Sequence, residues 1–365
     1  MARTKTTIGR TWHFVRFMGR NSAVHNLRVN QKSVGGFTHP YAISVAPDDM
    51  LFVLSRGNGY SNEMGHTSPP PPAGRVSKTT IDEDHLGDFA RADFIWPSGI
   101  AVASDGYVYC SDEYRQTIGV YHPDRLFPFP EFDPGGESVR EWGEHGSKPG
   151  QFDGPTGIDF DSQDNLHVVD SRNNRIQVFT TDGGLVRGWG GSGEAPGQFK
   201  RPWGIHVDKE NCVFVADWGN DRVQKFTPDG QYLMAFGSTI EDGGDLYRPA
   251  DVAVDSDGDV YITDWGNRRV QIYEPNGDII TALYGDADDP RMSGAAMHIL
   301  TRDPENQPAF NRVMHMPEFG RFGRPTGIAL TRDDHIAVCD TRGRVQVYKK
   351  DNEYMEPEVN FQIDG

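Results

Sequence analysis

The hydrophobic and polar positions of this chain form short β-like runs that recur in a fixed order. Residues 202–236 show the order clearly, with apolar or alternating runs at 205–207, 213–217, 222–226 and 232–236. Gly, Asp, Asn and Pro separate these runs, and such residues between short β-rich segments are typical of hairpins. The segment therefore predicts four antiparallel strands in one small sheet.

The same unit occurs six times. Each copy opens with a proline, followed two residues later by a small or acidic residue and then by a branched apolar run. The openings are residues 40–45, 97–102, 155–160, 202–207, 249–254 and 325–330. The basic spacing of about 47 residues is a period typical of propellers or arrays. Six units of four strands predict an all-β, six-bladed β-propeller that occupies residues 1–365 as a single domain, with blades opening near residues 40, 97, 155, 202, 249 and 325.

Several further motifs recur in some of the six units. An Asp ends the second run of five units, an Asn-x-Arg run begins the third, and a Pro-Gly-Gln-Phe phrase leads into two blades. The Asp residues are Asp112, Asp170, Asp217, Asp264 and Asp340. The Asn-x-Arg runs are residues 173–179, 220–226 and 267–273, and the Pro-Gly-Gln-Phe phrases are residues 149–152 and 196–199. These motifs resemble the NHL repeat family of β-propellers, which implies the fold and says little about chemistry. We expect the repeated Asp, Asn and Arg side chains to bond backbone groups across tight turns.

The two chain ends offer two ways of closing the ring. Residues 12–19 are similar to the fourth runs at 139–143 and 185–190, although they precede the first blade. This similarity predicts that the N-terminal segment is the outer strand of the last blade, an exchange that removes an open sheet edge. Residues 359–363 compete for the same place.

The composition narrows the class of partner. The net charge is −17, from 53 acidic and 36 basic residues, and this field disfavours nucleic acid. No apolar run approaches the ~20 residues of a membrane helix, and the first residues lack the apolar core of a secretory signal, so the cytoplasm is the expected location. Cys110, Cys212 and Cys339 fall in predicted second strands, where buried thiols are favoured over disulfides.

Long insertions interrupt the repeat. Residues 21–38, 57–74 and 285–324 fall in connections that share one face of a propeller, and residues 122–137 fall in a connection on the opposite face. Three long insertions on one face of the ring predict a lid over a central pocket, formed above all by residues 57–74 and 285–324. The alternative is that long surface loops merely tolerate change.

Two residues depart from the repeat in a chemically suggestive way. Arg56 follows the second run of the first blade, and Tyr114 occupies a turn where other blades have Gly. Both phrases resemble those of the peptidyl-hydroxyglycine amidating lyases, which are six-bladed propellers. The resemblance implies that Arg56 binds an anionic or oxygen-rich substrate group and that Tyr114 acts as acid or base.

The metal ligands of those lyases have no counterpart here. Their histidines directly follow the blade-opening proline, where this chain has Tyr41, Ser98, Thr156, Trp203, Ala250 and Thr326. His66, His298 and His315 in the insertions are the candidate ligands for a rebuilt zinc or iron site, with His39 beside the first opening. Asp112, Glu113 and Asp251 are candidate substrate-binding residues and offer an alternative, oxygen-rich calcium site.

Two classes of function remain. Tyr41 and Trp203 are placed to stack a flat or sugar-like ligand at the mouth. With Arg56 as oxyanion binder and Tyr114 as acid or base, the protein is a small-molecule lyase or hydrolase. The alternative is a non-enzymatic propeller that binds a protein or peptide on the same face. A metal-dependent lactonase would need one Glu, one Asn and one Asp at the axis, and no such set is evident.

Overall fold

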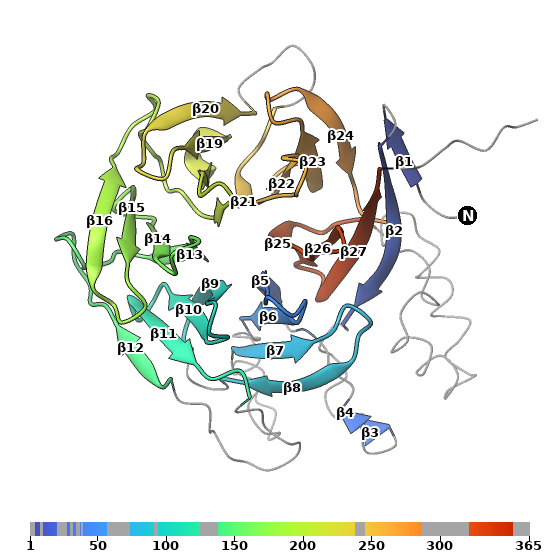
Figure 1. Cartoon of the computed structure of the whole chain (residues 1–365), viewed down its shortest axis with the longest axis horizontal. Helices are drawn as coiled ribbons and strands as arrows, with labels where there is room; N and C mark the ends of the chain where they lie inside the picture. Colours follow the sequence, from blue (N-terminus) through green and yellow to red (C-terminus); the bar gives the residue numbers. More distant parts are fainter. Residues whose placement is uncertain are drawn as a thin grey trace, which may run out of the picture.

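The computed structural model describes residues 10–19, 39–56, 74–90, 94–124, 138–237, 245–286 and 321–352, with residue 37 and short strands at 4–7, 28–29 and 32–33. Regular structure in these residues is β-strand, apart from one turn of 3-10 helix at Trp218–Asn220. Six antiparallel sheets stand around a common axis, as Figure 1 shows. The predicted six-bladed propeller is confirmed.

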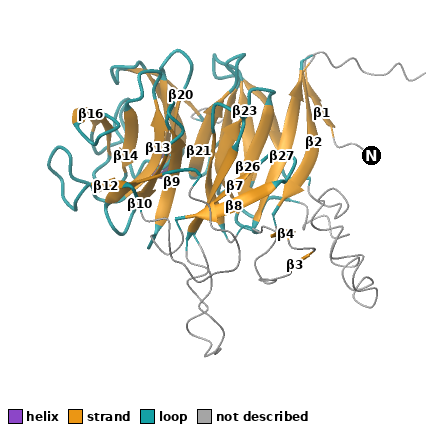
Figure 2. Ribbon diagram, turned by 60° about the horizontal axis from the view of Figure 1, so that its bottom comes forward, coloured by secondary structure: helices purple, strands orange, loops and turns teal. Residues whose placement is uncertain are grey.

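Blades one to five have four strands each, and the first strand along the chain is the innermost. Blade one contains β5 (Pro40–Val45), β6 (Leu51–Ser55), β7 (Arg75–Thr79) and β8 (His85–Phe89). Blade two contains β9 (Pro97–Val102), β10 (Val108–Asp112), β11 (Thr117–Tyr121) and β12 (Arg140–Trp142). Blade three contains β13 (Pro155–Phe160), β14 (Leu166–Asp170), β15 (Arg175–Phe179) and β16 (Leu185–Gly190). Figure 2 shows connecting loops gathered at the two faces of the ring.

The second half of the ring follows the same plan. Blade four contains β17 (Ile205–Val207), β18 (Val213–Asp217), β19 (Arg222–Phe226) and β20 (Tyr232–Phe236). Blade five contains β21 (Pro249–Val254), β22 (Val260–Asp264), β23 (Arg269–Tyr273) and β24 (Ile279–Leu283). Blade six contains β25 (Pro325–Leu330), β26 (His335–Asp340) and β27 (Arg344–Asp351), and β25 contacts β5 of blade one.

The N-terminal segment completes blade six. β2 (Arg10–Met18) pairs antiparallel with β27, and β1 (Thr4–Thr7) adds a fifth strand outside it. Trp12 is buried in the core between blades five and six, where its indole N–H donates to the Tyr261 hydroxyl at 3.1 Å. The predicted N-terminal closure is confirmed. The competing segment 359–363 lies outside the described residues. β3 (Arg28–Val29) and β4 (Lys32–Ser33) pair antiparallel with each other, and only their backbone is described.

The repeated polar residues hold the turns together. Asp170 accepts hydrogen bonds from the Asp153 backbone N–H at 2.7 Å, from Asn173 at 2.9 Å and from the Arg175 Nε at 2.8 Å. Asp217 binds the corresponding groups of blade four. The structural role predicted for these residues is therefore confirmed in both blades.

Glycine in the inner strands allows the blades to approach the axis. A Cβ on Gly157 would lie 2.6 Å from the Trp203 carbonyl oxygen, and one on Gly204 would lie 2.4 Å from the Asp251 Oδ1. Real side chains do not fit at such distances, so the close approach of neighbouring inner strands requires glycine there. The core lies between the blades, in buried apolar clusters such as the one around Phe214 and Tyr273.

The cysteines are free thiols, with Cys110 and Cys339 buried and Cys212 half-buried. The part of the chain that the structure describes contains no helix with the length and apolar character of a membrane span.

Candidate functional site

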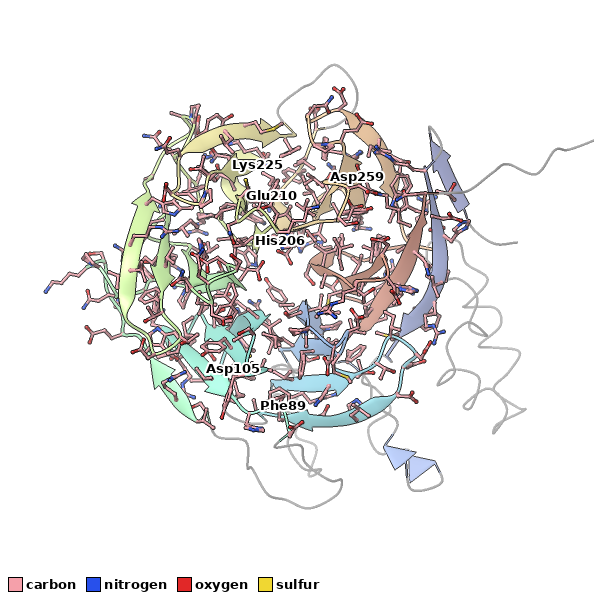
Figure 3. All side chains as sticks on the ribbon, viewed as in Figure 1. Phe89, Asp105, His206, Glu210, Lys225 and Asp259 are labelled. Carbon is pink, nitrogen blue, oxygen red and sulfur yellow. The ribbon has the colours of Figure 1, made fainter. Side chains whose placement is uncertain are left out.

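The inner strands surround a cavity of about 250 Å³ on the propeller axis. Residues of all six blades line it, and Figure 3 places His206 close to the centre of the ring. The lining changes character along the strands, because the residue after each opening proline lies at one end of the cavity and the fifth residue after it lies at the other. The two ends are therefore distinct environments.

Two aromatic rings meet at the first end. Tyr41 is the second residue of β5 in blade one, and Trp203 precedes β17 of blade four, three blades away around the ring. Their ring centroids are 6.3 Å apart at an interplanar angle of 64°, an edge-to-face contact across the axis. Ser98, Thr156, Ala250 and Thr326 occupy the same position in the other blades and are buried. We call this end the aromatic end.

The opposite end is lined by aliphatic side chains. Val45, Val254 and Leu330 are half-buried there and line the cavity. We call these three residues the aliphatic rim. Tyr41 and Trp203 are half-buried as well, so side chains at both ends of the cavity remain partly exposed.

Arg56, directly after β6, lies beside the aromatic end. Its guanidinium centre is 3.3 Å from the centroid of the Tyr41 ring and 4.8 Å from that of Trp96. The Nε donates to the Pro97 carbonyl oxygen at 2.8 Å, and the Nη2 donates to the Ser98 Oγ and to the Glu113 Oε1, both at 2.7 Å. Arg56 therefore joins blade one to blade two.

The charge of Arg56 is already paired. The side chains of Arg56 and Glu113 are only 14% and 9% exposed, and Ser98 also donates to Glu113. Arg172 approaches the other carboxylate oxygen of Glu113 at 3.9 Å but is 51% exposed. This ion pair is largely shielded from water, so it holds a fixed geometry.

Tyr41 stays protonated at neutral pH. Burial raises the pKa of Tyr41 to about 12, against the lowering effect of the nearby Arg56 charge. The phenol is therefore a hydrogen-bond donor or acceptor at this end of the axis and not a base.

The structure brings Arg56, Tyr41, Glu113 and Trp203 together but places Tyr114 elsewhere. Tyr114 is 70% exposed and lines a shallow hollow on blade two with Ile95 and Glu141. The residues that line this hollow are different from those that line the axial cavity. The turn position of Tyr114 gave no indication of the direction in which its side chain points.

Asp112 serves the turn of its own blade. Its carboxylate accepts hydrogen bonds from the backbone N–H groups of Ile95, Trp96, Tyr114 and Arg115. These bonds occupy the carboxylate with backbone groups of its own blade, whereas Asp170 also binds the side chains of Asn173 and Arg175. Asp112 therefore contributes to the fold rather than to the axial cavity.

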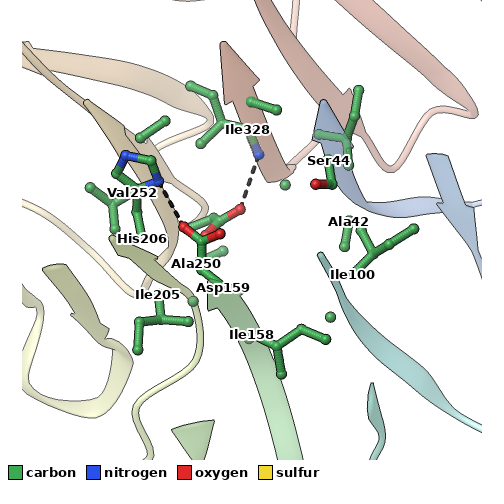
Figure 4. Close-up of a pocket in the computed structure, with 18 of the residues that line it drawn as sticks. Ala42, Ser44, Ile100, Ile158, Asp159, Ile205, His206, Ala250, Val252 and Ile328 are labelled. Carbon is green, nitrogen blue, oxygen red and sulfur yellow. Dashed lines mark hydrogen bonds and ion pairs between the residues drawn. The ribbon is translucent and has the colours of Figure 1, made fainter. Parts of the chain in front are cut away.

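Asp251 in β21 lies in the cavity, with two residues that the sequence reasoning missed. Its Oδ2 accepts a hydrogen bond from the Ile328 backbone N–H at 3.1 Å, and burial raises the pKa of Asp251 to about 7. His206 Nδ1 lies 3.1 Å from the Oδ2 of Asp159, which also accepts from the Val207 N–H at 2.8 Å. Figure 4 shows this pair joining two neighbouring inner strands.

A signal for the missed pair exists in the sequence. Asp159 and His206 occupy the fourth position after the opening proline, where the other blades have Ser44, Ala101, Ala253 and Ala329. An alignment of the six inner strands at that position identifies both residues as departures from the repeat.

The predicted metal ligands are not seen together. His66, His298 and His315 lie outside the described residues. Among the residues that are described, no three His, Cys, Asp or Glu side chains are arranged to hold a metal ion. Asp112, Glu113 and Asp251 bind backbone amides or Arg56, and only Asp251 lines the axial cavity, so the structure does not bring the three predicted calcium ligands together there.

Comparison with known proteins supports the repeat and the fold. The family model of the NHL repeat matches residues 246–273, and that of the SMP-30/Gluconolactonase/LRE-like region matches residues 141–239. No curated protein matches the chain in sequence. Each family model covers less than half of the chain, and together they identify it as a propeller with NHL-type repeats.

Solved structures with the same fold include enzymes. A catalytically inactive histidine-to-alanine variant of virginiamycin B lyase from Staphylococcus aureus, with quinupristin, aligns with a TM-score of 0.50 and 12% identity, over 93% of this chain and 99% of that one. A putative gluconolactonase aligns with a TM-score of 0.52 and 12% identity, over 86% and 89%. A Bacteroides thetaiotaomicron protein of unknown function aligns with a TM-score of 0.58 and 15% identity, over 94% and 76%. At these identities the likeness shows the fold alone.

Proposed function

We propose that this protein is a lyase or hydrolase that acts on a small molecule at the aromatic end of the axial cavity. The observation that carries the proposal is the Arg56–Glu113 pair, held against Tyr41 beside the axis at a position where the repeat has no arginine. The match to the gluconolactonase-like region and the propeller fold shared with a lyase support this class of function.

Arg56 is suited to bind a substrate oxygen. A guanidinium has five N–H donors, and three of those in Arg56 bind Pro97, Ser98 and Glu113. The guanidinium also hydrogen-bonds the Tyr41 side chain, and we assign the N–H groups of Nη1 to a substrate carboxylate, carbonyl or developing oxyanion. Because the group is fixed by its partners and by the Tyr41 ring, it requires little reorganisation during the reaction, and this is the condition for strong electrostatic stabilisation.

The other residues have supporting roles in this proposal. Glu113 positions the guanidinium, and Tyr41 and Trp203 form the walls against which a flat or sugar-like substrate stacks. Tyr114 is not part of the proposed site, because it lines a different hollow. A divalent metal with His66, His298 and His315 as ligands stays a prediction, and no step of the proposal depends on it.

The test is a substrate screen with a matched pair of variants. The wild-type protein is assayed against sugar lactones, aliphatic lactones and cyclic depsipeptides, and then compared with Arg56→Lys and Arg324→Lys. Arg324 lies 3.9 Å from the Trp265 ring, so it controls for the loss of an arginine–aromatic stack. We expect kcat/KM to fall about 10²–10³-fold in Arg56→Lys and to stay unchanged in Arg324→Lys. Equal effects of the two substitutions, or activity that survives Arg56→Lys, would overturn the proposal.

A binding propeller is the second candidate. Ile95 and Trp96 are 56% and 52% exposed, and Tyr114 lies near Ile95 in the hollow on blade two. Exposed apolar side chains that cluster in this way mark interaction surfaces in many proteins. A peptide-display selection separates the candidates, since Trp96→Ser and Tyr114→Ser should abolish peptide capture by a binding propeller, whereas Arg56→Lys should leave it intact.

A further inference from the structure

Two of the three ionisable groups deeper in the axial cavity, below Tyr41, are carboxyl groups. The three groups are Asp159 of blade three, His206 of blade four and Asp251 of blade five. The described residues that line the cavity include no lysine or arginine. Two carboxylates and one imidazole in a confined space favour a ligand that brings positive charge.

The repeat itself does not require these three residues. Asp159 and His206 stand where other inner strands have Ser or Ala, and Asp251 stands where five inner strands have Gly or Ala. Gly204 leaves the space that Asp251 occupies, because a Cβ there would lie 2.4 Å from the Asp251 Oδ1. Small residues would serve the fold at these positions, as they do in the neighbouring blades.

The local contacts leave hydrogen-bonding capacity that faces the cavity. His206 Nδ1 is held by Asp159, and His206 Nε2 has no partner in the described part of the chain. Asp251 uses its Oδ2 for the Ile328 backbone N–H and makes no ion pair within the described residues. Asp159 is already shared between His206 and the Val207 N–H. The imidazole and the Asp251 carboxylate are therefore the groups available to a ligand.

The remainder of the cavity suits a short hydrocarbon chain. The aliphatic rim of Val45, Val254 and Leu330 is half-buried at the end opposite Tyr41 and Trp203. The volume of about 250 Å³ lies below the ~300–1,000 Å³ of sites for drug-sized ligands. A cavity with acidic groups inside and an apolar rim matches a molecule with one charged end and a few methylene groups.

We propose that the axial cavity binds a small organic ammonium ion, with the nitrogen between Asp251 and His206 and the alkyl chain toward the aliphatic rim. This site uses other groups of the same cavity than the proposed reaction at Arg56, and the proposal does not depend on that reaction.

Protons compete with such a ligand. Burial opposes the charged form of His206, but the Asp159 carboxylate outweighs this and, with the charges of Asp251 and Asp208, raises the pKa of His206. Asp251, with a pKa of about 7, is influenced by His206 and Asp159. An ammonium ion favours neutral His206 and ionised Asp251, so binding releases protons near neutral pH. Affinity should rise between pH 6 and pH 8, by up to about tenfold per pH unit for each proton released.

The experiment is isothermal titration calorimetry of the full-length protein with n-butylammonium at pH 6, 7 and 8. Buffers with different ionisation enthalpies report the proton release. The neutral probe 1-butanol and the anionic probe butyrate have the same alkyl chain. Asp251→Asn keeps an acceptor for the Ile328 N–H and removes the charge, and Ser44→Ala changes another cavity residue without a change of charge.

We expect one n-butylammonium site per chain, tighter at pH 8 than at pH 6, with proton release. Asp251→Asn should weaken binding at least tenfold, and Ser44→Ala by less than twofold, with unchanged circular dichroism in both variants. Four outcomes would overturn the proposal: no binding of n-butylammonium at pH 8, equal binding of 1-butanol, tighter binding of butyrate, or full binding by Asp251→Asn. A displacement of n-butylammonium by Mn²⁺ at lower concentration would also overturn it, in favour of a metal site.

Discussion

Removal of Arg56 should destabilise the fold, because Glu113 would lose its main partner. A sequence-based view of Arg56 as a site residue predicts almost no change in stability, whereas the contacts predict the opposite. Breaking a buried pair from one side costs about 3–5 kcal/mol. Arg172 lies 3.9 Å from Glu113 and compensates in part, so we expect Arg56→Met to lower the free energy of unfolding by about 2–4 kcal/mol.

The assay is a double-mutant cycle. Urea unfolding is followed by tryptophan fluorescence for the wild type, Arg56→Met, Glu113→Gln and the double variant, with comparison of midpoints and m-values. Because Glu113→Gln removes the stranded charge, the double variant should be less destabilised than the sum of the single variants, by about 2 kcal/mol.

Two results would refute this reasoning. A cost below about 0.5 kcal/mol for Arg56→Met would show that Glu113 does not need the guanidinium. Additive single effects would show that the 2.7 Å contact between Arg56 and Glu113 contributes no coupling energy.

Three further predictions follow from other contacts. The side chain of Lys350 is 1% exposed and joins blade six to blade five through ion pairs with Asp255, Asp257 and Asp259. Lys350→Met should therefore lower the free energy of unfolding by at least about 3 kcal/mol. In the same urea titration, substitution of its exposed neighbour, Lys349→Met, should leave that free energy almost unchanged. Asp251 has a pKa raised from 3.8 to about 7, so between about pH 4 and pH 7 the folded protein keeps a proton that the unfolded chain loses. The contribution of Asp251 to stability therefore falls as the pH rises through that window. The stability of Asp251→Asn relative to wild type should increase over the same window by at most about 1.4 kcal/mol per pH unit and then level off. A pH-independent difference would contradict this. Tyr114→Ser should change unfolding free energy by less than about 0.5 kcal/mol and leave turnover unaffected, and a loss of turnover would restore Tyr114 to the site.

The architecture is predictable from the sequence because its signals are local. Each blade is marked by its own opening proline and turn residues, and the carboxylate of Asp170 binds groups within a few residues or in the loop leading into its own blade. The closing strand is predictable because Trp12 and its neighbours copy the pattern of a fourth strand. These patterns can be recognised in the sequence without knowing how the blades are arranged around the ring.

The site is less predictable because it depends on neighbours from different blades. Arg56 is recognisable as a departure from the repeat, but its pairing with Glu113 depends on the packing of blade one against blade two. Asp159 and His206 lie 47 positions apart in sequence and meet only because β13 and β17 are adjacent around the axis. Tyr114 departs from the repeat equally clearly, yet its turn directs it to solvent.

A crystal structure of the protein soaked with D-gluconate, the product of a sugar lactone, tests the central claim most directly. The account predicts a carboxylate oxygen at about 3 Å from the Arg56 Nη1, with the ligand against Tyr41 and Trp203. A ligand ordered in the hollow beside Tyr114, or in the cavity without contact to Arg56, would contradict the account.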